Sequence, residues 1–203
     1  YFRNHSKIFY SSLLSLFLVI ANGGLGAIVV SSILNPFIVS LHMILALFLV
    51  STLSYLTIES YKLFNDAKFT NIHLSKKISL SLICLWIFIV VEILLGTGIR
   101  TNIELIAVDN PLLSKGELLD ALNSYKYLHS ILGFSLLFFS MYLCFLFKDD
   151  FFGLSKLLVF FIFGMIIFQI FLGELMIFFD LPQLVRLFHT WGSSWLVGII
   201  IIL

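Results

Sequence analysis

The sequence predicts an all-α protein, a polytopic transmembrane helical bundle. Of its 203 residues, 61% are hydrophobic and only 11% are charged, and the mean hydropathy of +1.11 lies well above that of soluble domains. Six apolar stretches reach the length of about 20 residues that a helix needs to cross the hydrocarbon core. None alternates as a membrane strand would, so each is expected to be a helix, which satisfies its own backbone in lipid.

The six spans are expected in order along the chain. They cover residues 8–33, 37–61, 78–99, 127–147, 157–179 and 183–203. The first is too long for a signal peptide and lacks a small-residue cleavage site. Pro36 and Pro182 each stand where a helix can begin without losing a needed hydrogen bond, which predicts tight hairpins there. The outer loop, 101–125, is the only long one, and such loops often act as functional lids.

Basic residues are distributed unevenly between the two sides of the membrane. If the N-terminus is cytoplasmic, eight are inside and four outside, which favours cytoplasmic N- and C-termini. The inner set is Arg3, Lys7, Lys62, Lys68, Lys76, Lys77, Lys148 and Lys156, and the outer set is Arg100, Lys115, Lys126 and Arg186. A net charge of +1 without a basic run suggests no nucleic-acid partner. Cys84 and Cys144 lie within spans, so we expect core residues rather than a disulfide or metal framework.

Three odd-numbered spans end in a similar five-residue pattern. The copies are Asn22-Gly-Gly-Leu-Gly26, Glu92-Ile-Leu-Leu-Gly96 and Gln169-Ile-Phe-Leu-Gly173. Their period is too long for a solenoid and indicates a repeated helical hairpin. Small residues at such ends let membrane helices approach closely. The chain starts at Tyr1 without methionine and stops at Leu203 inside a span, so we expect it to be part of a longer protein.

Each even-numbered span carries one histidine near its outer end, namely His42, His129 or His189. Two of them follow the glycine of the repeat by sixteen residues. Ionisable side chains in a bilayer are costly and usually face a cavity, a cofactor or a partner. Unrelated packing needs would scatter them, so their equal depth predicts a shared site. His5 and His73 lie in polar segments and are expected to be solvated.

Several kinds of chemistry fit these side chains. Two imidazoles from facing helices of a bundle can ligate a haem iron. Zinc or copper is less well supported, because no cysteine or third ligand accompanies them. A proton relay with Glu92 and Glu174 stays open, as does simple hydrogen bonding of these carboxyl groups between helices. The Arg100 side chain is expected either to extend to the membrane–water interface or to pair with a haem propionate. Repeated hairpins also occur in small-solute or proton transporters.

The chain resembles the heme A synthase family, whose eight helices form two similar four-helix halves. The resemblance rests on Leu25-Gly-Ala-Ile-Val-Val30 with Leu41-His42, Leu95-Gly-Thr-Gly-Ile-Arg100, Tyr127-Leu-His129, and Leu172-Gly173 through Phe188-His189. It aligns the chain with helices three to eight of the family. Residues 1–77 are then a partial N-terminal half, and 78–203 a complete four-helix, haem-b-binding half. The family's first hairpin, with a catalytic glutamate, has no counterpart before Tyr1, which leaves catalytic residues unassigned.

The resemblance implies a membrane oxidase of the bacterial cytoplasmic (inner) membrane that converts haem O into haem A for terminal oxidase biogenesis. His129 and His189 would be the axial ligands of haem b, and His42 a ligand of the substrate haem. Arg100, Glu92 and Glu174 become supporting candidates. The implied partners are haem O, the bilayer, and haem O synthase or oxidase assembly factors. The family usually has arginine where Ser130 stands. The alternative is a haem b electron-transfer subunit linked to quinone.

Overall fold

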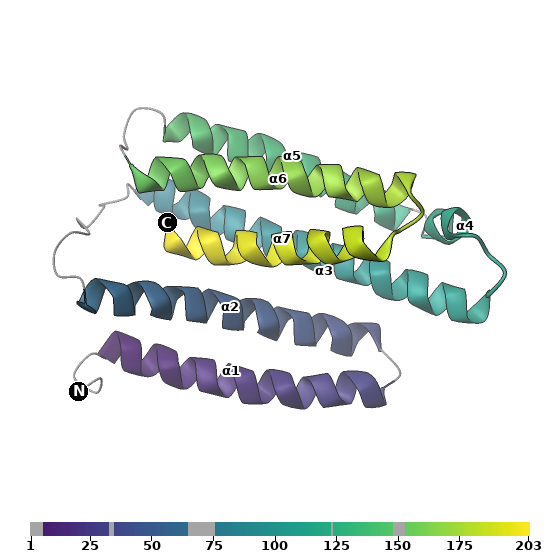
Figure 1. Cartoon of the computed structure of the whole chain (residues 1–203), viewed down its shortest axis with the longest axis horizontal. Helices are drawn as coiled ribbons and strands as arrows, with labels where there is room; N and C mark the ends of the chain where they lie inside the picture. Colours follow the sequence, from purple (N-terminus) through teal and green to yellow (C-terminus); the bar gives the residue numbers. More distant parts are fainter. Residues whose placement is uncertain (1–5, 33–34, 65–75, 123, 148–152) are drawn as a thin grey trace.

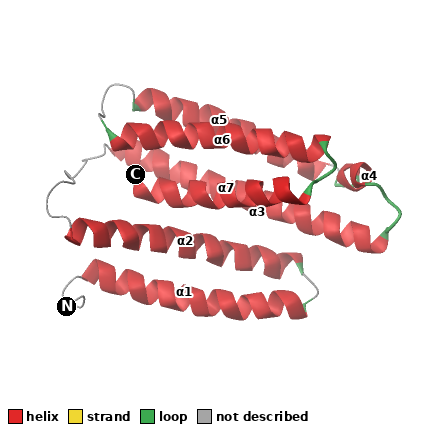
Figure 2. Ribbon diagram, in the orientation of Figure 1, coloured by secondary structure: helices red, strands yellow, loops and turns green. Residues whose placement is uncertain are grey.

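The computed structural model describes residues 6–32, 35–64, 76–122, 124–147 and 153–203 (Figure 1). Within these ranges the regular elements are all helices (Figure 2). They are α1 (Ser6–Ser31), α2 (Pro36–Phe64), α3 (Lys76–Asp109), α4 (Lys115–Asp120), α5 (Ser124–Leu146), α6 (Leu154–Phe178) and α7 (Gln183–Ile202). All but α4 are long and apolar enough to cross a membrane. The predicted all-α, six-span fold is confirmed, and the chain is a multi-pass membrane protein.

Helices α3, α5, α6 and α7 form a closed ring of four. The neighbouring pairs are α3 with α5, α5 with α6, α6 with α7 and α7 with α3, so α5 and α7 stand diagonally opposite. Each of the four contributes to one buried core, which includes Leu85, Leu143, Ile162 and Val197. Because lipid competes for apolar surface, close packing of this kind is what holds membrane helices together.

The hairpin α1–α2 lies along one side of the ring (Figure 1). Helix α2 packs on both α3 and α7, whereas α1 makes its extensive contacts with α2. Trp86 of α3 donates from Nε1 to Ser51 Oγ of α2 at 3.2 Å, which ties the hairpin to the ring. The outer face of α1 is apolar and exposed, as a surface in contact with lipid should be.

The expected end of the third span near residue 99 was wrong, because α3 continues to Asp109. Arg100 and Glu104 form an i,i+4 ion pair at 3.0 Å on this extension, an arrangement that supports a helix. Asn102 Nδ2 also donates to the Gly98 carbonyl at 2.8 Å. Pro111, which disfavours a helical residue before it, follows the end of α3.

The rest of the expected 101–125 loop contains the short helix α4. Ser114 caps it, since its hydroxyl accepts from the Glu117 backbone N–H while the Glu117 side chain accepts from the Ser114 N–H. The Ser114 N–H and hydroxyl both hold the pKa of Glu117 below its ordinary value. The expected 101–125 loop is therefore largely helical, because it includes the end of α3 as well as α4.

Candidate functional site

The three histidines of the spans lie at matching positions near the starts of their helices. His42 is the seventh residue of α2, His129 the sixth of α5 and His189 the seventh of α7. At 1.5 Å per residue, each lies about 8–9 Å from the start of its helix. These three helices all start at the same end of the bundle (Figure 1). His5 and His73 fall outside the described residues.

Each of these histidines packs on the last glycine of a five-residue repeat, an arrangement that we call a histidine seat. The seats pair Gly26 with His42, Gly96 with His129 and Gly173 with His189, and a Cβ built on the glycine would lie 3.4, 3.2 and 3.9 Å from Cε1 of the ring. The glycine clears space for the imidazole against the neighbouring backbone. The repeat seen in the sequence thus has a physical purpose in all three copies.

A polar residue stands one helical turn before each seat glycine, at Asn22, Glu92 or Gln169. His42 Nδ1 lies 3.1 Å from the backbone carbonyl of Asn22. Since a carbonyl can only accept, this contact requires a proton on Nδ1 and leaves Nε2 as the free lone pair. His129 Nδ1 lies 3.0 Å from Glu92 Oε1, across the α3–α5 contact.

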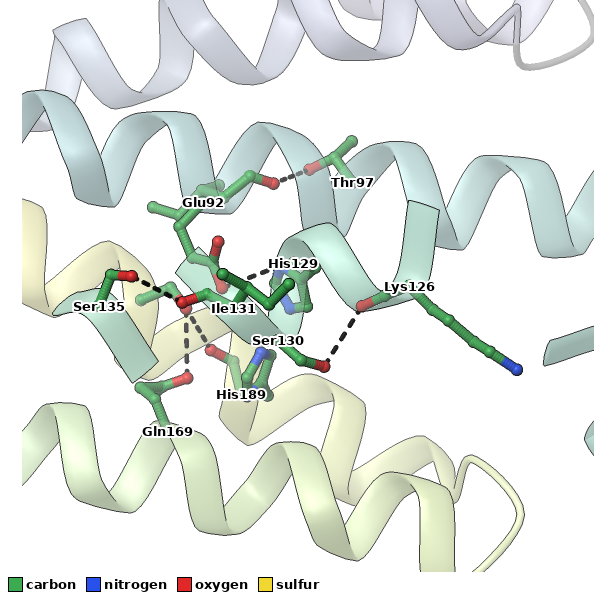
Figure 3. Close-up of polar contacts among 11 residues, drawn as sticks. Glu92, Thr97, Lys126, His129, Ser130, Ile131, Ser135, Gln169 and His189 are labelled. Atoms are coloured by element: carbon green, nitrogen blue, oxygen red, sulfur yellow. Dashed lines mark hydrogen bonds and ion pairs between the residues drawn. The ribbon is translucent and has the colours of Figure 1, made fainter. Parts of the chain in front are cut away.

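His129 and His189 come together inside the ring although they stand on diagonal helices (Figure 3). Buried polar atoms without a hydrogen-bond partner in the described part of the chain gather around them: Glu92 Oε2, His129 Nδ1, Gln169 Nε2, Arg186 Nε and His189 Nδ1. The 3.0 Å contact between His129 and Glu92 is close enough for an ion pair but is not aligned as a hydrogen bond.

Unpaired polar atoms in a membrane interior are expensive. A ligand that offers carboxylates to an arginine would satisfy Arg186 Nε, and two imidazoles from opposite sides would supply nitrogens to a metal at its centre. Haem, with its axial iron positions and its propionates, fits this donor set. In the described part of the chain, no cluster of three His, Cys, Asp or Glu side chains is placed to hold another metal ion.

The other predicted candidates have separate surroundings. Arg100 is paired with Glu104 on the outward extension of α3, and its side chain is 65% exposed. Glu174 is exposed on α6. The Ser130 hydroxyl donates to the Lys126 carbonyl in its own helix. The structure thus brings Glu92 to the histidines, and the propionate role of Arg100 stays a prediction.

Sequence reasoning gave no role to Gln169 or Arg186. Gln169 is 8% exposed, and its Oε1 accepts from Ser193 Oγ at 3.2 Å. Arg186 stands one turn outward of His189 on α7. The sequence did contain signals for both residues, since all three repeats start with a polar residue and Arg186 is a charge in an apolar span.

Two surface grooves lie away from these residues. They measure about 550 and 460 Å³, lie on α1 and beside the start of α5, and are lined by no histidine.

Comparison with known proteins gives one match. A family model described as cytochrome oxidase assembly protein (COX15-CtaA) covers residues 1–201. The chain belongs to this family, the heme A synthase family. The match spans both the α1–α2 hairpin and the ring, so the resemblance seen in short motifs holds over the whole chain. No curated protein and no solved structure gave a match.

Proposed function

We propose that this member of the COX15-CtaA family is a haem-binding membrane oxidase that converts haem O into haem A. The observation that carries the proposal is the meeting of His129 and His189 inside the ring, at matching positions of their helices. Diagonal helices present their side chains from opposite sides, so these two histidines would be able to hold one haem iron between them.

The residues divide into a haem b set and a substrate set. His129 and His189 would hold haem b in the four-helix half formed by residues 78–203, and His42 would hold the substrate haem in the region formed by residues 1–77. His42 already has Nδ1 against a carbonyl, which leaves Nε2 for a metal. Arg186 and Arg100 are the cations available for propionates. No catalytic residue is assigned.

The bound haems would supply the redox chemistry by which a ring methyl becomes a formyl group. The chain's own part is to hold each macrocycle by its histidines and to keep water away from it. The apolar core of the ring suits the second task. The uneven distribution of basic residues supports cytoplasmic termini, and we propose the bacterial cytoplasmic membrane as the location.

A reduced-minus-oxidised absorption spectrum of the purified full-length protein tests the haem b assignment. We expect a low-spin haem b signal that is lost in the His129→Ala, His189→Ala double variant and kept in His42→Ala. The absence of the signal in the parent protein, or its survival in the double variant, would contradict the proposal.

Pigment analysis tests the reaction itself. Haem is extracted from cells that express the full-length protein together with a source of haem O. The oxidase predicts a haem carrying the formyl group. Low-spin haem b without any formyl product would instead indicate the electron-transfer subunit, and would overturn the proposed reaction while leaving haem binding in place.

A further inference from the structure

Glu92 faces His129 from the neighbouring helix of the ring (Figure 3). The two side chains are 17% and 24% exposed, and Glu92 Oε1 lies 3.0 Å from His129 Nδ1. Gly133, one turn further along α5, makes room for the carboxyl group, since a Cβ there would lie 3.2 Å from Oε1. A carboxyl group in this position is well placed to accept the proton of Nδ1.

Gln169 stands at the equivalent position of the repeat on α6, and its Oε1 accepts from Ser193 Oγ of α7. It stands at the same position of its repeat as Glu92, on the helix diagonally opposite. Its amide lies against Gly192, three residues after His189, where a Cβ would collide with Nε2. The two histidine helices of the ring, α5 and α7, thus each carry a glycine that admits one polar side chain from the helix beside it. One of these side chains has a carboxyl group and the other a neutral amide.

We propose that Glu92 is a positioning residue for His129: its carboxyl group accepts the Nδ1–H and so turns Nε2 toward the haem iron. Gln169, at the same position of its repeat, carries a neutral amide, so His189 has no carboxyl group from that position. This inference rests on the proposed function. Histidines that bind metals commonly donate their other N–H to a carboxylate or carbonyl, which fixes the ring and strengthens the nitrogen as a ligand. The two histidines that would hold the haem would therefore differ in donor strength.

The test uses the full-length protein carrying its haem, with two substitutions at one position. Glu92→Gln keeps the shape and an accepting oxygen, so haem binding persists, while the midpoint potential of the low-spin haem rises because an amide is a weaker acceptor. Glu92→Leu removes the acceptor, and haem retention is expected to weaken about 10-fold, as for other supporting partners of metal ligands.

Asp109→Asn is the matched control, since it makes the same carboxyl-to-amide change at the exposed end of the same helix. It should leave both haem content and potential unchanged. If the parent protein binds haem while Glu92→Gln keeps the parent potential and Glu92→Leu keeps its haem, this inference fails and the proposed function stands. If the parent binds no haem, the proposed function itself fails. Should Glu92→Leu not fold, the potential of Glu92→Gln still decides.

Discussion

The ring and the α1–α2 hairpin contain the same histidine seat, but the histidines have different neighbours in the two regions. In the ring two seats meet across a diagonal, so that His129 and His189 lie together among buried polar atoms. In the hairpin, His42 packs on Gly26, and its Nδ1 meets a backbone carbonyl. The comparison teaches that a seat is a packing unit for one histidine. A second seat opposite it is what creates a pair of ligands.

The strongest expected contrast is in tolerance of an added methyl group. In the ring, Gly192→Ala would drive a Cβ into Gln169, and overpacking of this kind costs about 1–3 kcal/mol. In α1, Gly24 has nothing within 4 Å of a built Cβ, so Gly24→Ala should be neutral or gain up to about 1 kcal/mol of helix propensity. Apparent Tm in detergent measures both. Equal Tm values for the two variants would contradict the expected difference in packing between Gly192 and Gly24.

The seats should differ in how closely the glycine packs against the imidazole ring. At Gly96 a built Cβ lies 3.2 Å from the His129 ring, whereas at Gly173 it lies 3.9 Å from His189, an ordinary contact. Gly96→Ala should therefore cost about 1 kcal/mol, the lower end for overpacking, and Gly173→Ala much less. Apparent Tm and the low-spin haem signal both report this order. The reverse order would show that the seats are not defined by ring contact.

A side-chain hydrogen bond links the two regions. Trp86→Phe removes the hydrogen bond to Ser51 that joins α3 to α2, and a typical hydrogen bond contributes about 0.5–1.5 kcal/mol. Trp195→Phe is the control, because Trp195 is 62% exposed. Thermal unfolding in detergent should show a lower Tm for Trp86→Phe alone. A similar fall for the control would mean that the indole ring, rather than the bond, matters.

The smallest effect is expected at α4, where a pH change should act locally. The pKa of Glu117 is lowered by its bonds to Ser114, so its contribution to the helix cap is present above its ordinary pKa and lost as pH falls through the lowered value. The protection factors of the α4 amides, which compare their hydrogen exchange with that of an unstructured chain at the same pH, should fall in acid. Glu117→Gln should abolish this pH dependence, and persistence of the dependence would place its origin in another group.

Much of the fold could be predicted from the sequence, because a long apolar stretch in lipid must form a helix to satisfy its backbone hydrogen bonds. The same holds for the matching positions of His42, His129 and His189 near the starts of their helices. The α3 extension was missed because hydropathy reports the bilayer boundary and is silent about helices that continue beyond it. The cap of α4 was readable as Ser114 three residues before Glu117.

The order of helices around the ring could not be read from the chain. Nothing local says that α5 and α7 stand diagonally, so the meeting of their histidines depends on packing between distant segments. The polar start of each repeat was visible at Glu92 and Gln169. The residues that Glu92 and Gln169 contact depend on the packing of α3 beside α5 and of α6 beside α7.

The seats also differ in how much chain must be ordered to close them. Sixteen residues separate Gly26 from His42 and Gly173 from His189, whereas thirty-three separate Gly96 from His129. Doubling a flexible connection raises the entropic cost of closure by about 0.6 kcal/mol. The helical extension of α3 and the capped turn of α4 shorten the flexible part of the longer connection. Two seats thus close within a single hairpin, while the third depends on an ordered bridge outside the membrane.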